Sequence, residues 1–334
     1  MKVGILGGTG NISASVVRLL LERGHDVTCV TRGSSGALPE GARHLAGDRH
    51  DLEWFIPAVQ RERFDAAVDF IGFTPAHGAA CLEAFRDVGH FVHTSTVTTV
   101  GETADWLPIT EDHPLRPAVP YAEQKVALDR LYQAAFYDRG FPATIIKPST
   151  TYGRKRVVRQ VGIDTRWIRR IREGRPILRV GEGTALHHLL HVDDAATGFV
   201  GALERDRTIG QVYFLVNPHA LEWSDIHRVA MDVLGNQVEQ VGVSSELLYE
   251  LDPKRFLMVP GVFAKNLLYS AEKIQRDVPE FRPSVSLHDG LADAFAHLEA
   301  HGLVEDVPVG DWEDRIIEIQ RDARTRILNG GDHD

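Results

Sequence analysis

A glycine-rich turn near the N-terminus is the feature that most constrains how this chain can fold. The sequence GGTGNIS at residues 7–13 follows the apolar run 3–6 and precedes a helical stretch over residues 14–23. Such a turn brings the backbone close to a pyrophosphate, and its N–H groups and the positive end of the helix dipole hold the anion. The order of strand, glycine turn and helix therefore predicts a dinucleotide site, with a loop that only turns the chain as the alternative.

Strand and helix patterns alternate through the first half of the sequence. Strands are predicted over residues 26–31, 64–70, 90–94 and 142–147, and helices over residues 51–60, 76–86 and 119–139. This alternation is typical of a doubly wound parallel sheet, an α/β fold of the Rossmann type.

The pattern changes after residue 149, and a strand over residues 211–216 is predicted to return to the main sheet. We therefore predict a dinucleotide-binding domain formed by residues 1–150 plus about 191–217. Residues from about 151–190 plus 218–328 are predicted to form a smaller substrate-binding cap over the carboxyl ends of the strands, because ligands bind at that edge in open α/β sheets.

Charge and cysteine content narrow the function classes. The net charge of −10 argues against a nucleic-acid partner, since Lys and Arg supply most of such affinity. The two cysteines, Cys29 in a predicted strand and Cys81 in a predicted helix, indicate neither a disulfide framework nor a thiolate metal cluster. We expect a reducing, cytoplasmic compartment, and no membrane association because no apolar run approaches the roughly 18 residues of a membrane span.

His187 and His191 are four residues apart, which is the spacing of a metal pair on a helix. The run 189–192 is predicted to be a strand that enters a helix, so no metal is expected.

Tyr121 and Lys125 are four residues apart on the predicted helix 119–139, so their side chains share one face. A nearby cation favours the phenolate, and a phenol with an ordinary pKa of about 10 needs that help to act as a base near neutrality. Tyr121 thereby becomes an acid–base candidate, with an ordinary solvated pair as the alternative.

These segments resemble the extended short-chain dehydrogenase/reductases, a family that includes nucleotide-sugar epimerases and dehydratases, from residue 1 to about residue 203. In that family the catalytic Ser or Thr lies five residues before a glycine and 25 residues before the tyrosine. Counting from Gly101 and from Tyr121 gives Thr96 both times. The resemblance implies a catalytic triad of Thr96, Tyr121 and Lys125, with Ser95 as the alternative hydroxyl.

The resemblance also implies what each group does. Thr96 is expected to hydrogen-bond the substrate, Tyr121 to exchange its proton, and Lys125 to hold the nicotinamide ribose. Asp48 is expected to bind the adenine amine, unless it only caps the helix that follows. The full set of expected cofactor-binding residues is Gly7, Thr9, Gly10, Asn11, Ile12, Arg32, Asp48, Arg49, Phe70, Ile71, Gly72, Tyr121, Lys125, Pro148 and Ser149.

Two departures from the family pattern concern the cofactor. NAD-preferring relatives carry an acidic residue after the second strand, whereas this chain has Thr31 followed by Arg32. Loss of the carboxylate and gain of a guanidinium favour NADP over NAD, without excluding NAD. Ser13 replaces the third glycine, and its small side chain is expected to permit close packing of helix on strand.

A further departure concerns the substrate. Nucleotide-sugar members carry an arginine that grips the substrate diphosphate where this chain has His187. A neutral imidazole is a poor substitute for a bidentate cation, which favours a nucleoside, a sugar monophosphate or a smaller alcohol over a UDP- or dTDP-sugar. The expected substrate-binding residues are Thr98, Thr150, Arg154 and His187.

Three function classes follow. The leading one is an epimerase or dehydratase that oxidises a secondary alcohol of a sugar, nucleoside or nucleotide-sugar transiently and keeps its NAD or NADP tightly bound. The positions Val97 and Thr98, where sugar 4,6-dehydratases carry Asp and Glu, disfavour that particular dehydration. The second is an NADPH-dependent carbonyl reductase or alcohol dehydrogenase. The third is a binding protein similar to the chloroplast stem-loop-binding branch of the superfamily. A homodimer is left open.

Overall fold

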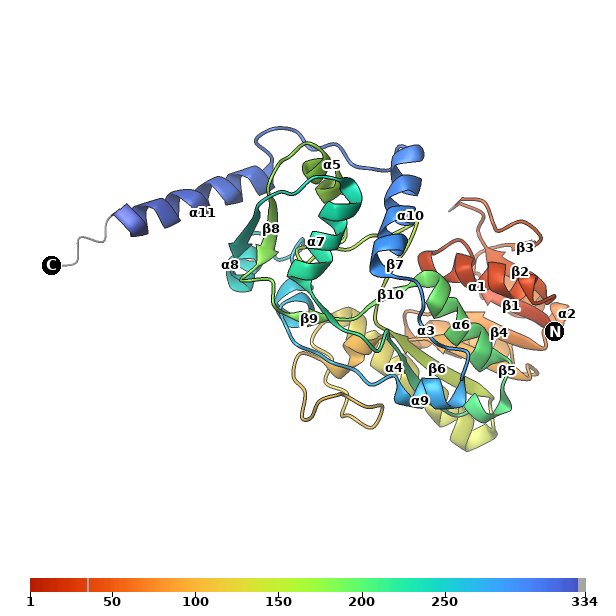
Figure 1. Ribbon diagram of the computed structural model, residues 1–334. Coiled ribbons are helices and arrows are strands. Elements are labelled where there is room, and N and C mark those ends of the chain that lie inside the picture. Colours follow the sequence, from red (N-terminus) through yellow and green to blue (C-terminus); the bar gives the residue numbers. More distant parts are fainter. Residues whose placement is uncertain (35, 330–334) are drawn as a thin grey trace. The chain divides into compact units, whose positions relative to one another are not determined.

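The computed structural model describes residues 1–34 and 36–329, which form two compact units (Figure 1). The first unit contains Met1–Thr151, His188–His219 and Leu267–Val285. The second contains Tyr152–His187, Ala220–Asn266 and the described chain from Ser286 on.

The segment Leu267–Val285 lies in the first unit, whereas the sequence pattern placed it in the substrate region. Its backbone is bound to the loop before the long helix, since Ile109 N–H donates to Leu268 O at 2.6 Å and Ser270 N–H donates to Ile109 O at 2.8 Å. The Tyr269 ring also packs edge-on against Phe214, with 5.2 Å between ring centroids. These long-range contacts explain why the segment belongs to the first unit.

A parallel sheet of seven strands forms the centre of the first unit within the described residues, in the order β11-β6-β5-β4-β1-β2-β3. Its strands are β1 (Lys2–Leu6), β2 (Asp26–Thr31), β3 (Arg43–Ala46), β4 (Ala66–Asp69), β5 (His90–Thr94), β6 (Ala143–Pro148) and β11 (Val212–Leu215). The strand order reverses between β1 and β4, and this switch point is where ligands bind in such sheets. The predicted doubly wound α/β fold is confirmed.

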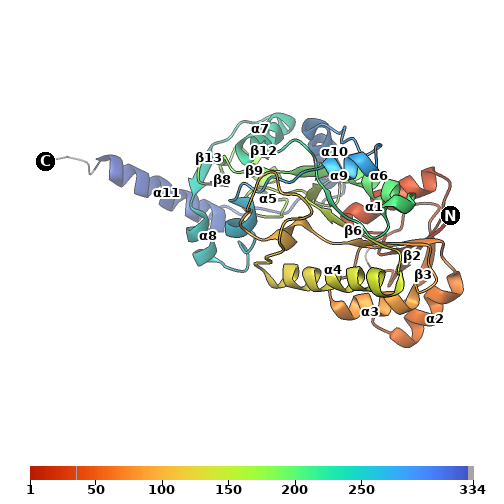
Figure 2. The ribbon, with the colours of Figure 1, turned by 90° about the horizontal axis from the view of Figure 1, so that it is seen from below.

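Helices cover both faces of this sheet (Figure 2). On one face lie α1 (Asn11–Glu22), α6 (Val192–Leu203) and α9 (Glu272–Asp277), and on the other lie α2 (Leu52–Glu62), α3 (Pro75–Ala84) and α4 (Pro120–Arg139). Two buried apolar clusters correspond to these faces, one containing Val16 and Phe199 and the other Phe55 and Leu128.

Local sequence signals explain where the helices begin and end. Asp51 caps α2 by accepting a hydrogen bond from Trp54 N–H at 3.2 Å, and Thr74 caps α3 in the same way through His77 N–H at 3.3 Å. Pro120 opens α4, and Gly140 ends it in the left-handed conformation, with φ of 67°.

The second unit consists mainly of helices and short strand pairs. Its elements are α5 (Arg166–Arg172), β8 (Ile177–Val180), β9 (Leu186–His187), β12 (Leu221–Glu222), α7 (Trp223–Leu234), β13 (Gln240–Val243), α8 (Ser245–Leu251), a π-helical turn η3 (Val259–Phe263), α10 (Leu287–Ala300) and α11 (Trp312–Asn329). β8 pairs with β13 in parallel, and β9 pairs with β12 antiparallel.

Four short elements complete the description. The 3₁₀ turns η1 (Val97–Val100) and η2 (Asp206–Thr208) and the strand β10 (Leu189–His191) belong to the first unit, and β7 (Thr150–Tyr152) carries the chain from the first unit into the second. β10 leads directly into α6, as predicted for the run 189–192. None of the helices in the described part of the chain is both long and apolar enough to cross a membrane.

Candidate active site

The glycine turn follows β1 at the switch point of the sheet and requires glycine at two positions. Gly7 and Gly8 have φ of 107° and 111°, which side-chain-bearing residues rarely adopt. A Cβ on Gly8 would also lie 2.6 Å from Cys29 Sγ. The turn therefore exists only with glycine, and it leads straight into α1 at Asn11.

Ser13, in place of the third glycine, is buried and binds the turn. Its Oγ accepts hydrogen bonds from Gly8 N–H at 3.2 Å and from Gly10 N–H at 2.9 Å. The Ser13 hydroxyl thus joins two backbone groups of the turn.

Two side-chain oxygens beside this turn fit a bound cofactor. Asn11 Nδ2 donates to Thr151 Oγ1 at 3.3 Å, while Asn11 Oδ1 is buried with no hydrogen-bond partner within residues 1–34 and 36–329. Ser149 Oγ, just after β6, is buried in the same way. Because buried polar atoms are normally satisfied, both suit a ligand that supplies hydrogen bonds. Of the other expected cofactor residues here, Thr9 and Ile12 are half-buried, Gly10 is exposed and Pro148 ends β6.

Asp48 lies in the loop between β3 and α2 and accepts hydrogen bonds from His50 N–H at 3.0 Å and His50 Nδ1 at 2.7 Å. These bonds, with a smaller contribution from the Arg32 cation, hold the pKa of Asp48 below its usual range. Asp51, not Asp48, caps α2. The capping alternative is therefore wrong, and Asp48 is left as an ionised acceptor near an exposed arginine.

Arg49 is placed differently from its neighbour. Its guanidinium is buried and binds Asp69, with Nη1 at 3.0 Å from Oδ1, and it also donates to His77 O at 3.3 Å. Burial opposes ionisation of Asp69, but Arg49 and other nearby groups outweigh it and hold the pKa of Asp69 below its ordinary value. This side chain serves the interior, so the backbone is what Arg49 can offer a cofactor.

The expected stretch Phe70-Ile71-Gly72 follows β4. Ile71 N–H donates to Asp69 Oδ1 at 2.9 Å, and Gly72 O accepts a hydrogen bond from Lys125 Nζ at 2.6 Å. Phe70 packs on Phe199, with ring centroids 5.1 Å apart. The Asp69 carboxylate and the Lys125 amine thus both bind the backbone of this loop.

The two candidate hydroxyls after β5 lie in different surroundings. Ser95 is buried, and its Oγ donates to Asp129 Oδ2 at 3.0 Å. Thr96 is half-buried at the start of η1, where its Oγ1 accepts from Thr98 N–H at 3.3 Å and lies 3.0 Å from Thr98 Oγ1. Of the two residues, Thr96 is the less buried, which favours it over Ser95.

Tyr121 and Lys125 begin α4, as their spacing predicts. The Tyr121 side chain is 45% exposed, whereas Lys125 is 1% exposed with its Nζ 5.9 Å from the centre of the Tyr121 ring. Lys125 Nζ also donates to Thr94 O at 2.6 Å. Burial lowers the pKa of Lys125 to about 8, although the Asp69 and Asp129 carboxylates oppose that shift. The buried Lys125 amine thus lies close to the exposed Tyr121 ring.

The expected substrate residues are divided between the units. Thr98 in η1 and Thr150 at the start of β7 belong to the first unit. Arg154 belongs to the second, where its guanidinium binds Asp293 at 2.7 and 2.8 Å on the surface. His187 on β9 stacks on Trp223 at 4.5 Å and meets the edge of Phe263 at 5.4 Å.

Sequence reasoning missed four polar residues near these groups. Asp129 and Lys147 form a buried ion pair of 2.8 Å. A signal for it existed, because a lysine in an apolar strand needs a buried partner and Asp129 follows Lys125 by one helical turn. His50 and His77 approach to 3.2 Å between their Nε2 atoms, and no pattern in the sequence indicates that contact. No cluster of three or more metal-ligating side chains occurs in the described ranges.

Comparison with known proteins places this geometry in context. The model of the NAD dependent epimerase/dehydratase family matches residues 3–215. A 2'-dehydrokanamycin reductase of Streptomyces kanamyceticus is 30% identical over 260 residues, which is 77% of this chain and 74% of that protein. The chloroplast stem-loop binding protein of 41 kDa b of Arabidopsis thaliana is 23% identical and covers 88% of this chain and 78% of its own.

Solved structures share the fold. A UDP-glucose 4-epimerase of Thermotoga maritima with UDP-glucose matches with a TM-score of 0.74 at 18% identity, over 90% of this chain and 99% of that one. A UDP-glucuronic acid 4-epimerase of Bacillus cereus with UDP-glucuronic acid and NAD matches with a TM-score of 0.73 at 20% identity, over 90% of this chain and 100% of that one. Because the family model spans the sheet and the glycine turn, the chain belongs to the NAD-dependent epimerase/dehydratase family, within the extended short-chain dehydrogenase/reductases.

Proposed function

We propose that this enzyme binds NAD(P) at the glycine turn and oxidises a secondary alcohol of a sugar-like substrate, returning the hydride after epimerisation or loss of water. The observation that carries the proposal is the pairing at the start of α4, where the buried Lys125 has its Nζ 5.9 Å from the ring centre of Tyr121, which is 45% exposed. Thr96, just before η1, is half-buried. Solved relatives with UDP-glucose or UDP-glucuronic acid support a sugar-bearing substrate.

Each residue of the triad has a distinct task in this proposal. Thr96 donates or accepts one hydrogen bond at the substrate oxygen, and Tyr121 takes the proton of the alcohol when it is oxidised and gives it back on reduction. The Lys125 cation favours the phenolate of Tyr121. A nicotinamide cofactor supplies the acceptor for the hydride, and the residues that would hold it include Asn11, Asp48 and Ser149.

NADP is the proposed cofactor. Arg32 is exposed, and its charge helps to lower the pKa of the Asp48 carboxyl. The guanidinium and the carboxylate are thus available to bind the adenosine part of the cofactor.

We also propose a cytoplasmic location, because both thiols are free and buried, and burial raises the pKa of Cys29 to about 12. A homodimer is proposed from the exposed Ile319, Ile327 and Leu328 of α11, and sedimentation at two concentrations tests it.

A net reductase is the second candidate, because a 2'-dehydrokanamycin reductase is 30% identical over most of both chains. The two candidates differ in what happens to the cofactor. Denaturing the purified protein and identifying any released dinucleotide by absorbance and mass distinguishes them. A stoichiometric, retained cofactor supports transient oxidation, and an empty protein that consumes NADPH in proportion to product supports the reductase.

The substrate is tested by comparing a nucleoside, a nucleoside monophosphate and UDP-glucose as ligands of the cofactor-loaded protein. His187 stacks among aromatic rings and offers no bidentate cation, so we expect the less charged compounds to bind better. Clear preference for UDP-glucose contradicts this expectation. The phosphate ligand would then be Arg154 or Arg156, which lies two residues further along the chain.

A further inference from the structure

A buried ion pair lies one helical turn beyond Lys125. Asp129 on α4 and Lys147 on β6 approach to 2.8 Å between Oδ2 and Nζ, and their side chains are only 2% and 3% exposed. Burial opposes ionisation of Asp129, but the Lys147 cation and the hydrogen bonds around it hold the pKa of Asp129 below its ordinary value. Asp129 is therefore ionised at neutral pH.

Both ends of the pair are bound to the stretch that carries Thr96. On the N-terminal side, Ser95 Oγ donates to Asp129 Oδ2 at 3.0 Å. On the C-terminal side, Lys147 Nζ donates to Thr99 Oγ1 at 2.9 Å, and Thr99 Oγ1 donates to Thr96 O at 2.9 Å. One ion pair thus holds the residue before Thr96 and, through Thr99, the Thr96 carbonyl.

His93 is the third side chain next to Asp129. His93 Nε2 lies 3.5 Å from Asp129 Oδ1, and its ring packs against Tyr132 with centroids 4.9 Å apart. Burial lowers the pKa of His93, which keeps it neutral. The charge balance at this point therefore comes from Asp129 and Lys147.

Stability alone is a weak reason for such a pair. Removing two ions from water costs several kcal/mol each, and well-packed apolar residues of similar volume often stabilise a core as well or better. What apolar residues cannot do is hold Ser95 and Thr99 by directed hydrogen bonds. The hydrogen bonds that the pair makes with Ser95 and Thr99 both lead to the turn that carries Thr96.

We infer that Asp129 and Lys147 are positioning residues that fix the Thr96 hydroxyl for catalysis. The inference rests on the proposed function, in which Thr96 contacts the substrate. Asp129 joins the same helix that carries Tyr121 and Lys125 to the turn that carries Thr96, so the pair sets the relative placement of the triad. A misplacement of about 1 Å can lower a rate on the order of a hundredfold.

The decisive variant is the double substitution Asp129→Leu with Lys147→Met, which removes both charges together and leaves no unpaired ion. Its control is Arg205→Met with Glu280→Leu, a partly exposed ion pair of 2.5 Å in the same unit that contacts no triad residue. We expect the melting temperatures of both double variants to stay near that of the unchanged protein.

The first readout needs no substrate. With 13C-methyl-labelled threonine, the Thr96 methyl signal, assigned through Thr96→Ser, should broaden or split in the Asp129/Lys147 variant. The methyl signal of Thr144, which is buried in β6 and donates to Thr208 O at 2.7 Å, should stay sharp. An unchanged Thr96 signal in the folded variant overturns the inference.

The second readout is turnover of whichever panel compound the protein converts with NADP. We expect kcat to fall by roughly 10- to 100-fold with little change in KM. Asp129 and Asp69 raise the Lys125 pKa, whereas burial and Arg49 lower it. Loss of Asp129 should therefore lower the Lys125 pKa, and the alkaline fall of kcat should move to lower pH. Unchanged kcat beside an inactive Tyr121→Phe overturns the inference alone, whereas an active Tyr121→Phe overturns the proposed function.

Thr99→Val keeps the inference testable if the double variant does not fold. It preserves the shape of the side chain and the ion pair, and removes only the hydroxyl between Lys147 and the Thr96 carbonyl. A smaller broadening of the Thr96 methyl signal is expected. An unchanged Thr96 methyl signal in this variant contradicts the proposal that Lys147 positions Thr96 through Thr99.

Discussion

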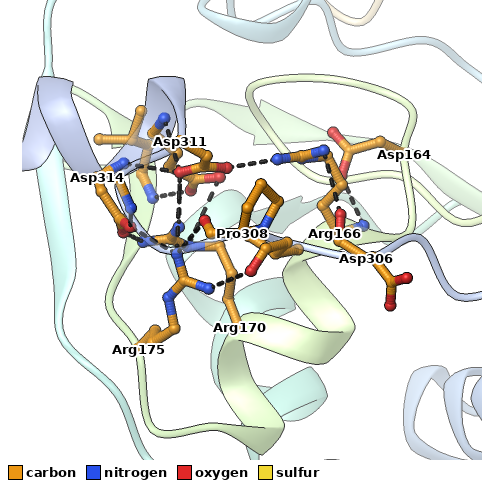
Figure 3. A network of polar contacts seen from close by, with 12 residues as sticks. Asp164, Arg166, Arg170, Arg175, Asp306, Pro308, Asp311 and Asp314 are labelled. Atoms are coloured by element: carbon orange, nitrogen blue, oxygen red, sulfur yellow. Dashed lines mark hydrogen bonds and ion pairs between the residues drawn. The ribbon is translucent and has the colours of Figure 1, made fainter.

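Both units bury charged side chains, and the two groups differ in what they hold. In the first unit, Asp129 and Lys147 lead to the turn bearing Thr96. In the second, Arg170 and Arg175 bind Asp311 and Asp314 around the start of α11 (Figure 3). The second group connects α5 to the C-terminal helix and touches no triad residue in the described chain. Buried charge by itself therefore does not indicate a functional site. The residues to which the charged side chains are bonded distinguish the two cases.

The largest expected effect on stability is in the second unit. Glu313 is fully buried and accepts hydrogen bonds from Arg159 Nη1 at 2.7 and 2.9 Å and from Leu178 N–H at 2.9 Å. Glu313→Gln leaves buried cations undercompensated and should lower the free energy of unfolding by about 3–5 kcal/mol in urea titration.

The matched control is Glu318→Gln, an exposed position on the same helix, which should change that free energy little. Turnover per folded molecule should be unaffected by either change. A loss of turnover in folded Glu313→Gln contradicts the contrast drawn between the two charge groups.

In the first unit the large effect should fall on chemistry instead. Tyr121→Phe removes the proposed proton-transfer group and should lower kcat at least about a hundredfold while melting temperature and cofactor binding are kept. Tyr137→Phe, on the same helix with Tyr137 78% exposed, is the control. Equal turnover in the two variants refutes the assignment of the triad.

Cofactor choice should respond to Arg32, at a somewhat smaller scale. Arg32→Ala should weaken NADP by about 1.5–3 kcal/mol relative to NAD, because a charge-assisted contact to the 2'-phosphate is lost. Arg86, an exposed arginine paired with Glu83 in the same unit, provides the control variant Arg86→Ala. Equal weakening of both cofactors means that Arg32 does not read the phosphate.

The smallest effect on stability is expected at an exposed pair of the second unit. Arg154 and Asp293 are 56% and 42% exposed, so Arg154→Ala should change the unfolding free energy by less than about 1 kcal/mol. Titration with UDP-glucose then shows whether Arg154 serves binding. A measurable loss of affinity with unchanged stability assigns it to the site, and a large loss of stability places it with Glu313.

The elements of the sheet were predictable because their signals are local. Alternating patterns give β2 and β5 with the bounds that the structure has, and Pro120 and Gly140 delimit α4. The family spacing selects Thr96, which the structure places just before η1, whereas Ser95 is buried and bound to Asp129.

What the sequence does not reveal depends on contacts between distant segments. The return of Leu267–Val285 follows from the pairing of Ile109 with a backbone some 160 residues later. Arg49 is among the residues expected at the cofactor, and the structure shows that its guanidinium binds Asp69 in the interior. Neither partner is close in sequence, so periodicity and turn signals are silent about both.

The hydroxyl of Ser13 determines when the glycine turn becomes ordered. Flexible glycine segments lose much conformational entropy when a ligand fixes them. Here two of the turn's N–H groups are already bound to Ser13 Oγ, so that loss occurs when the protein folds. In the proposed function, a dinucleotide would meet a turn that is already ordered, so less of its binding energy would be lost to ordering the turn.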